Sequence, residues 1–498
     1  MRRTRSWGTA PSRSTTGKWS ANSCAPGFPR TRAVARISLA EAARGTIGVL
    51  LRGDPDTMVE SYSIDTRTLK VGELFFALVG PNHDAHRFVP EAIRQGAKAV
   101  VISRGRAGDF PGEAAILRVA DTTQALQDLA HWVRQRQPLR VLGITGSSGK
   151  TTTKEMSAAV MEEAMPTLKS TGNLNNSYGL PLCLLGVQPE HQAAVLEMGM
   201  SYPGELSRLA AIANPDVGVL LNVHPVHLEH FHSLSAIAEA KGELFRGMRE
   251  QAVAVYNADD PEAARVALPF PGEKIGFGFG ESARVRAIDL EPQGEEGTAF
   301  VISGLGQPLP VQIPFPGRHH VANALAAAAA AHAAGAGSDA IRRGLARTRP
   351  LPMRGALLRF PGDIRVLDET YNSNPKAMER TLETLSGMVA LRKVVVSGDM
   401  LELGPIEDQA HRLLGEQVAR SGVSLLVAVG PLSKHAAESA QAAGMEEVRH
   451  FEDSSSAAAF LARVLQPGDL LLVKGSRGMA MERVVDAIRA SRGQEEGA

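Results

Sequence analysis

The stretch Gly143-Ile-Thr-Gly-Ser-Ser-Gly-Lys-Thr-Thr152 directly follows the apolar run 139–142. Its glycines allow the backbone to curl so that several N–H groups point at phosphate oxygens, and a following helix adds the positive end of its dipole. Lys150 can reach the outer phosphates, and the Thr151 hydroxyl can bind Mg²⁺. Position 144 is isoleucine where the strict P-loop pattern has glycine. A strand before and a helix after still favour a phosphate-binding loop over an ordinary Gly/Ser turn.

Strands and helices alternate on both sides of this loop. Apolar runs predict strands over 139–145, 193–198, 217–222 and 252–257, and helical patterns cover 150–164 and 235–248. This alternation predicts a mainly parallel sheet flanked by helices.

Two further blocks complete the predicted organisation. Before polar residues 131–137, strands are predicted over 74–79 and 97–103, and 90–96 has the pattern of a helix end. After the joint Pro350-Leu-Pro352, strands are predicted over 366–368, 393–397, 424–429 and 469–473, each followed by a helical pattern that indicates a doubly wound domain. The sequence therefore predicts an α/β protein with domains over 36–137, 138–350 and 351–498, in keeping with the length of 498 residues.

The first 35 residues are rich in Arg, Ser and Pro and have no apolar core of the kind that a secretory signal needs. A transit peptide would have a similar composition. We expect a disordered or mis-started extension over residues 1–35.

Composition excludes several classes of protein. The formal net charge of +1 gives no reason to expect nucleic acid or an anionic membrane surface as a partner. Two cysteines, Cys24 and Cys183, cannot form a disulfide framework, which favours a reducing, cytoplasmic location. The most apolar run, 321–335, is mostly alanine and contains His332, so we expect a tightly packed helix there and no membrane span.

Two charged residues near the predicted strand ends are candidates for chemistry. Glu197 ends the apolar run 193–196, and the carboxyl end of a strand in a P-loop domain is where Mg²⁺ is held. Lys241 lies in a predicted helix, and from the residues alone it is an ordinary lysine of an amphipathic helix. A functional lysine there would need burial or neighbours that favour its neutral form.

Four histidines, His224, His227, His230 and His232, fall within nine residues. One interpretation is a zinc site. The other is a loop at a strand end in which one histidine meets a Mg²⁺-phosphate and the others are solvated or structural. The spacing matches no standard zinc pattern, so the second interpretation is favoured.

Taken together, the motifs resemble the Mur ligase family. The shared set is Thr145-Gly-Ser-Ser-Gly-Lys-Thr151, Leu196-Glu-Met-Gly199, Asn222 with His227-Leu-Glu229, Ala240-Lys-Gly-Glu243, Gly317-Arg-His319 with Asn323-Ala-Leu-Ala326, and Asp368-Glu-Thr-Tyr-Asn-Ser-Asn-Pro375. A second set resembles the D-alanyl-D-alanine-adding branch: Asp65-Thr-Arg67, Leu74-Phe-Phe-Ala-Leu78, Asp84-Ala-His86, Gly172-Asn-Leu-Asn-Asn176, Gly398-Asp-Met-Leu-Glu-Leu-Gly404, and Val473-Lys-Gly-Ser-Arg477 with Met481-Glu482. Their order and spacing cover about residues 36–490.

The resemblance implies a role for each matching residue. ATP would be bound by Thr145, Gly146, Ser147, Ser148, Gly149, Lys150, Thr151, Asn323, Arg354, Asp368 and Glu369. The catalytic set would be Lys150, Thr151, Glu197, His227 and Lys241. Two Mg²⁺ ions would be held by Thr151, Glu197, His227 and a carbamylated Lys241, a role that replaces the ordinary one inferred for this lysine above. The nucleotide-sugar peptide would meet Asp65, Thr66, Arg67, Asn173, Asn175 and Asn176. The chain departs from the family pattern at His224, His230, His232, His320 and Glu369.

The implied reaction is the ATP-dependent joining of D-Ala-D-Ala to a UDP-MurNAc-tripeptide through an acyl phosphate, by a cytoplasmic monomer. Pro350–Pro352 would be the hinge for closure over ATP. Three alternatives remain at this point: a sister ligase or folate-type polyglutamate ligase, a P-loop switch or motor ATPase, and a binding module without catalysis.

Overall fold

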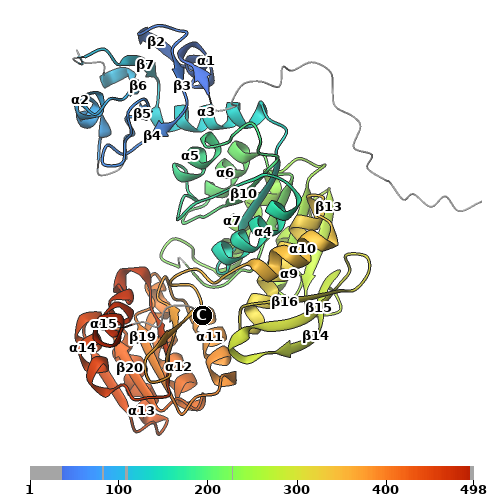
Figure 1. The fold of residues 1–498 in the computed structure, drawn as a ribbon, viewed down its shortest axis with the longest axis vertical. Coiled ribbons are helices and arrows are strands. Elements are labelled where there is room, and N and C mark those ends of the chain that lie inside the picture. Colours follow the sequence, from blue (N-terminus) through green and yellow to red (C-terminus); the bar gives the residue numbers. More distant parts are fainter. Residues whose placement is uncertain (1–35, 81–82, 107–109, 111, 227, 494–498) are drawn as a thin grey trace, which may run out of the picture. The chain divides into compact units, whose positions relative to one another are not determined.

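The computed structural model describes residues 36–80, 83–106, 110, 112–226 and 228–493 (Figure 1). Over these residues the chain forms three larger α/β sheets and a small antiparallel pair, β1 (Ile37–Ser38) with β3 (Met58–Val59). None of the helices in the described ranges is long and apolar enough to cross a membrane. The predicted extension, residues 1–35, lies outside the described residues.

The first sheet has, in the described part of the chain, five strands in the order β2-β7-β6-β5-β4. Their bounds are Val49–Arg52 (β2), Tyr62–Ser63 (β4), Leu74–Phe76 (β5), Ala99–Ser103 (β6) and Ala115–Val119 (β7). Its helices are α1 (Leu39–Gly45), α2 (Val89–Arg94) and α3 (Thr122–Gln135). The predicted strand over 74–79 is present but ends at Phe76, because the Leu78 N–H donates back to the Phe76 carbonyl and turns the chain.

The middle sheet contains the predicted phosphate loop. Counting described residues, it has nine strands in the order β16-β15-β14-β13-β12-β11-β8-β10-β9. The strands are β8 (Arg140–Thr145), β9 (Thr167–Lys169), β10 (Ala193–Glu197), β11 (Val217–Leu220), β12 (Val253–Asn257), β13 (Glu273–Gly278), β14 (Val285–Pro292), β15 (Thr298–Ser303) and β16 (Leu309–Ile313). The helices are α4 (Lys150–Ala164), α5 (Gly179–Leu185), α6 (Glu205–Ala213), α7 (Leu234–Arg246), α8 (Pro261–Ala267), α9 (Arg318–Ala333) and α10 (Ser338–Arg347).

The predicted parallel sheet is confirmed from β9 to β14. The sequence interpretation missed its antiparallel extension, in which β14, β15 and β16 follow one another along the chain and in space. Buried and partly exposed residues alternate strictly along β15, as expected for a strand with one covered face, but the apolar run 299–302 hides this alternation in the sequence.

The alanine-rich run predicted as a tightly packed helix is α9, and its residues from His320 to Ala331 are buried except Ala322. Small side chains allow helices to approach closely on this side of the middle sheet. A Cβ added at Gly344 of α10 would lie 2.4 Å from the Val160 Cα of α4. Because interiors are close-packed, such contacts fix α4, and with it the loop that precedes α4.

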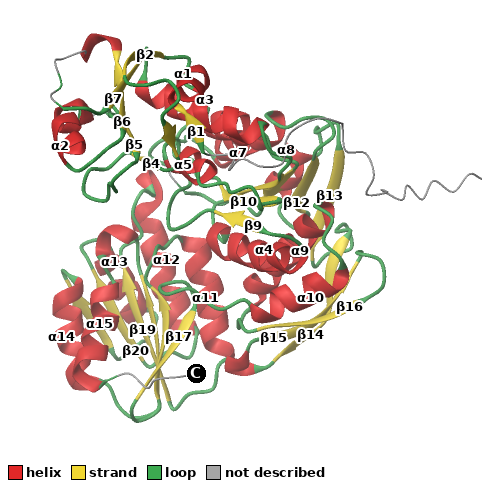
Figure 2. Cartoon of the chain, turned by 45° about the horizontal axis from the view of Figure 1, so that its top comes forward, coloured by secondary structure: helices red, strands yellow, loops and turns green. Residues whose placement is uncertain are grey.

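The third sheet is doubly wound, as predicted. In the described residues its strand order is β17-β18-β22-β19-β20-β21, with only β17 antiparallel to its neighbour. The strands are β17 (Ala356–Phe360), β18 (Ile364–Glu369), β19 (Arg392–Gly398), β20 (Leu425–Val429), β21 (Val448–Phe451) and β22 (Asp469–Lys474). The helices are α11 (Pro375–Gly387), α12 (Glu407–Arg420), α13 (Ser433–Ala442), α14 (Ser454–Val464) and α15 (Glu482–Arg492). One apolar cluster includes residues of α11, α12 and α13, and a separate one includes α14 and α15, so both faces are covered (Figure 2).

Each sheet falls within one of the three predicted domain ranges, 36–137, 138–350 and 351–498. The boundaries themselves stay predictions. The proposed hinge, Pro350–Pro352, lies between α10 and β17, and Leu351 forms isolated bridges with Arg354 and Gly355.

Candidate functional site

The phosphate loop lies between β8 and α4, as the sequence predicts. Gly149 adopts the left-handed conformation with φ of 80°, which a residue without a Cβ tolerates at little cost. Asn222, which follows β11, forms hydrogen bonds with two residues of the loop. Its Oδ1 accepts from the Ser148 N–H at 2.9 Å, and its carbonyl accepts from the Ser147 N–H at 3.1 Å. The loop shape is therefore fixed by a contact between two neighbouring strand ends.

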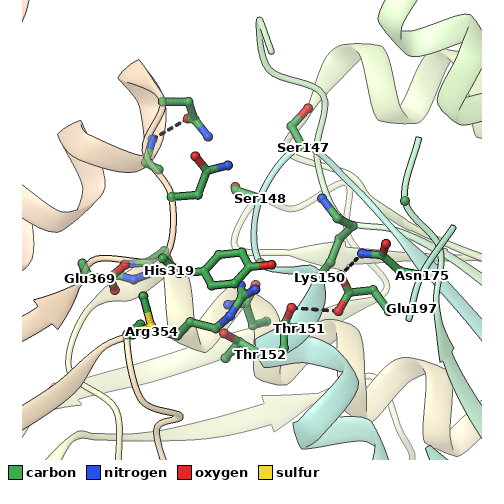
Figure 3. A pocket seen from close by; sticks show the side chains of 18 of the residues that line it. Ser147, Ser148, Lys150, Thr151, Thr152, Asn175, Glu197, His319, Arg354 and Glu369 are labelled. Carbon is green, nitrogen blue, oxygen red and sulfur yellow. Dashed lines mark hydrogen bonds between the residues drawn. The ribbon is translucent and has the colours of Figure 1, made fainter. Parts of the chain in front are cut away.

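A cavity of about 380 Å³ opens beside this loop (Figure 3). Its wall combines the loop and α4 with residues that follow other strands of the middle and third sheets. Of the predicted site residues, those on the wall are Ser147, Ser148, Gly149, Lys150, Thr151, Asn175, Asn176, Glu197, Asn323, Arg354 and Glu369.

Glu197 is the centre of a buried hydrogen-bond network on one side of the cavity. The Thr151 hydroxyl donates to its Oε2 at 2.7 Å, and the Asn175 amide donates to its Oε1 at 2.8 Å (Figure 3). A hydroxyl and a carboxylate at the cavity wall are oxygen ligands of the kind that Mg²⁺ prefers.

The Lys150 side chain folds back over its own loop. Its Nζ donates to the Gly146 carbonyl at 2.8 Å. Burial lowers the pKa of this amine below its ordinary value, Glu197 opposes that shift, and Arg354 adds to it. The lysine is thus held where an incoming anion would meet a desolvated cation.

Lys241 departs most from what its own sequence context suggests. It lies on α7 and is only 2% exposed, so the interpretation as an ordinary amphipathic-helix lysine is wrong. Its amine has no hydrogen bond or ion pair with any described residue. Burial, and secondly the charge of Lys150, hold the pKa of Lys241 well below its ordinary value. This environment favours the neutral amine relative to the ammonium.

The third sheet contributes cations and a carboxylate to the cavity. The Arg354 guanidinium lies 3.5 Å from the centroid of the Tyr371 ring, and both residues line the cavity. Glu369 accepts from the Lys474 ammonium at 3.1 Å. Asp368 is turned toward the backbone instead: it accepts from the Met353 N–H and the Thr370 hydroxyl, and burial raises its pKa.

Asn323 lies against the phosphate loop. A Cβ added at Gly149 would be 2.5 Å from its Oδ1. The predicted contact of Asn323 with adenine stays a prediction, because the structure places this side chain beside the loop that would hold phosphates.

Several predicted residues do not line the cavity. Thr145, Gly146 and Asp368 are buried and are not among the residues that line the cavity. Asp65, Thr66 and Arg67 follow β4 in the first sheet, where Arg67 forms a 2.6 Å ion pair with Asp65. Asn173 is also absent from the wall, and His227 lies outside the described residues. Their roles stay predictions.

The four-histidine loop does not form a zinc cluster in the described residues. The His230 ring lies 4.4 Å from the Tyr202 ring, and burial lowers the pKa of His224 to about 3.

Sequence reasoning assigned no role to other residues on the wall. They include Thr152, His319, His320, Tyr371, Asn372, Asn374, Arg380 and Lys474. Most belong to motifs that carried the family resemblance, at 317–326, 368–375 and 473–477. Arg380 had no such signal, and only the course of α11 brings it to the cavity.

Comparison with known proteins agrees with this geometry. Residues 144–331 match the Mur ligase middle domain, and residues 353–477 match the Mur ligase, glutamate ligase domain. The chain is 37% identical to the UDP-N-acetylmuramoyl-tripeptide–D-alanyl-D-alanine ligase of Escherichia coli (strain K12) over 439 residues, which are 87% of this chain and 94% of the relative.

Two solved structures are similar along most of the chain. MurF from Acinetobacter baumannii matches with a TM-score of 0.84 and 32% identity, over 91% of this chain and 99% of that one. The MurF ligase from Thermotoga maritima in complex with ADP matches with a TM-score of 0.76 and 29% identity, over 87% of this chain and 98% of that one. This chain therefore belongs to the Mur ligase family, and within it to the UDP-N-acetylmuramoyl-tripeptide–D-alanyl-D-alanine ligases.

Proposed function

We propose that this chain joins D-Ala-D-Ala to the terminal carboxylate of UDP-MurNAc-tripeptide and converts ATP to ADP and phosphate. One observation supports this most directly: the phosphate loop and the cations Arg354 and Lys474 line the same cavity. Backbone amides at a helix start and fixed cations opposite them are what a triphosphate requires. Family membership supplies the two substrates that are joined.

The reaction needs activation because a carboxylate and an amine do not condense in neutral water. The amine is protonated, and the carboxylate has no good leaving group. Transfer of the γ-phosphoryl group to the carboxylate breaks the bond to the bridging oxygen of ATP and forms an acyl phosphate and ADP. The amine nitrogen of D-Ala-D-Ala then bonds to the acyl carbon, loses a proton, and phosphate departs.

The protein contributes charge and position to these steps. Lys150 and Arg354 place positive charge beside the transferred group, where negative charge is spread over its oxygens. The Asn222 hydrogen bonds hold the loop amides in one arrangement, so little reorganisation is needed during transfer. Closure of the third sheet over the cavity would keep water from the acyl phosphate.

The residues present fit two magnesium ions. Thr151 and Glu197 offer oxygen ligands at the first site. For the second, the buried Lys241 amine, which has no partner among the described residues, can add carbon dioxide, and the resulting carbamate would supply oxygen ligands together with His227. When bound, the ions would neutralise charge on the phosphoryl oxygens.

The remaining assignments are part of the same proposal. ATP is bound by the phosphate loop with Asn323, Arg354, Asp368 and Glu369. The nucleotide-sugar peptide meets Asp65 to Arg67 in the first sheet and the Asn173–Asn176 loop. The enzyme acts as a cytoplasmic monomer.

Phosphate release tests the proposal. The full chain is incubated with ATP, Mg²⁺ and UDP-MurNAc-tripeptide carrying either lysine or diaminopimelate, with and without D-Ala-D-Ala. Sustained phosphate release is expected only when ATP, Mg²⁺, the nucleotide-sugar tripeptide and D-Ala-D-Ala are all present. The pentapeptide product should then be detected by mass spectrometry. A panel of single amino acids in place of D-Ala-D-Ala identifies a sister ligase if one of them is the better acceptor. Release from ATP alone at the same rate would indicate a switch or motor ATPase and would contradict the proposal.

A further inference from the structure

Three side chains of metal-binding types converge at the edge of the cavity. His319 and His320 lie in the first turn of α9, and Glu369 is the last residue of β18. One ligand atom from each residue lies within 4.8 Å of the other two. Among the described residues, these three form the single cluster of three or more His, Cys, Asp or Glu side chains close enough to share a metal ion. Figure 3 shows His319 and Glu369 together on the side of the cavity opposite Glu197.

The imidazoles of His319 and His320 lack polar partners within the described part of the chain. Neither ring makes a hydrogen bond or ion pair with a described residue. His320 is only 5% exposed, and its Nδ1 is enclosed without a partner. The His319 and His320 rings pack at 4.0 Å, and Phe315 holds the His320 ring from another side at 4.9 Å. A buried ring nitrogen without a hydrogen bond is destabilising, so the enclosed Nδ1 of His320 points to a missing ligand.

Lys474 holds one carboxylate oxygen of Glu369. Oε2 accepts from the Lys474 ammonium at 3.1 Å, and Lys474 also donates to the Asn372 carbonyl at 3.0 Å. A Cβ added at Gly355 would lie 3.4 Å from Oε1 of Glu369 and 3.2 Å from Nε2 of His320. Oε1 of Glu369 and Nε2 of His320 therefore border the same space beside the glycine. Lys474 orients the carboxylate from behind, as partners of metal-binding carboxylates do.

We propose that His319, His320 and Glu369 form a binding site for one late first-row divalent transition ion, with Zn²⁺ as its test ligand. Two imidazoles and one carboxylate are a donor set for zinc and cobalt, whereas Mg²⁺ and Ca²⁺ take oxygen ligands. Three protein ligands leave a fourth position for water. Ligands that are each about 2.0–2.2 Å from zinc lie about 3.3–3.6 Å apart in a tetrahedral site, so binding draws the three side chains together.

The position of the site gives it a consequence. Two ligands belong to the helix that follows the middle sheet, and the third belongs to the third sheet, so the ion links the two. The ligands also line the cavity assigned above to ATP. Bound zinc therefore opposes nucleotide entry, a step that rests on the proposed function, whereas metal binding itself does not.

Metal titration of the nucleotide-free, Mg²⁺-free full chain tests the proposal. Co²⁺ is added first and followed by its visible d–d absorption, and Zn²⁺ then displaces it, with heat measured in parallel. One site per chain is expected. His320→Asn and Glu369→Gln should each weaken binding at least about tenfold, the scale on which loss of a metal-site partner acts. Matched circular dichroism spectra show that both variants are folded.

His230→Asn is the matched control, since it changes a histidine of the four-histidine loop and should leave metal affinity unchanged. Loss of binding in His230→Asn with full binding in His320→Asn would move the site to that loop and overturn the proposal. Absence of any saturable binding would also overturn it. The titration measures metal binding and not turnover. Its result can therefore be interpreted even if the protein shows no ligase activity.

Discussion

The Thr151 hydroxyl donates a 2.7 Å hydrogen bond to Oε2 of Glu197, across 46 positions of sequence. Both side chains are buried, so the bond fixes the hydroxyl and the carboxylate relative to each other at the cavity wall. Thr151→Val keeps the shape and removes the hydroxyl. It should raise the Mg²⁺ concentration needed for half-maximal ligase rate by about 10–100-fold. Thr151→Ser is the control and should stay close to the parent. Equal Mg²⁺ dependence in all three proteins would exclude Thr151 from the metal site.

Lys150→Ala should lower phosphate release in the complete reaction by about 10²–10³-fold, the scale for loss of one preorganised group beside developing charge. The comparison is Lys434→Ala, which removes an exposed lysine of α13. Thermal unfolding of both variants should resemble that of the parent. A Lys150→Ala protein that turned over at the parent rate would show that the phosphate loop is wrongly assigned.

Lys241 offers a test of the carbamate. Lys241→Ala should be nearly inactive, and added short carboxylic acids should restore part of the rate, because they can supply the oxygen ligands that the carbamate would provide. Lys241→Arg keeps a cation but cannot be carbamylated, so it should be inactive and should not respond to the acid. Labelled ¹³CO₂ should give a carbamate signal by NMR in the parent alone. Full activity of Lys241→Arg would reject this role.

Gly149 and Gly204 form a matched pair, since each precedes a helix with left-handed φ, 80° and 88° respectively. Alanine in this conformation costs about 1–2 kcal/mol. A Cβ at Gly149 also meets Asn323 at 2.5 Å, whereas a Cβ at Gly204 meets nothing within 4 Å. Gly149→Ala should therefore lower the free energy of unfolding more than Gly204→Ala does, and only Gly149→Ala should raise KM for ATP. Equal effects on both measurements would contradict the packing argument.

His224 makes acid stability testable. Burial lowers its pKa from 6.5 to about 3 in the folded chain, with Arg380 adding to the shift. Between these values the unfolded chain binds a proton that the folded chain does not, so falling pH favours unfolding. His224→Gln should flatten the dependence of the free energy of unfolding on pH in this window by up to about 1.4 kcal/mol per pH unit. His83→Gln, which replaces an exposed histidine, should keep the parent slope. An unchanged slope in His224→Gln would indicate that the imidazole is already protonated when folded.

The sequence predicted elements correctly where the apolar pattern and the residues that start and end an element indicated the same bounds. The helix over 150–164 matches α4 at both ends, because Gly149 starts it and the following Pro166 prevents its continuation. The antiparallel extension β14–β16 was missed because the sequence of β15 is continuously apolar over 299–302, and only β16 has a clear period-two pattern.

The site was predictable where residues sit at strand ends or in the loop, and unpredictable where tertiary packing decides. Thr151 and Glu197 follow from their places after β8 and at the end of β10. The burial of Lys241 does not, since an α7 lysine beside Glu239 and Glu243 has the appearance of a surface residue until its neighbours are placed. Arg380 and the convergence of His319 with Glu369 depend on segments about 50 residues apart, for which no local pattern exists.

The contact between Asn323 and Gly149 also bears on how the enzyme matures during synthesis. During synthesis, the phosphate loop leaves the ribosome about 170 residues before α9, the helix whose Asn323 packs against Gly149. Until α9 docks, the phosphate loop lacks this packing contact. A nascent chain or a fragment that ends near residue 300 should therefore not bind a nucleoside triphosphate, although it contains the whole loop. Nucleotide binding should therefore require the docking of α9 against Gly149.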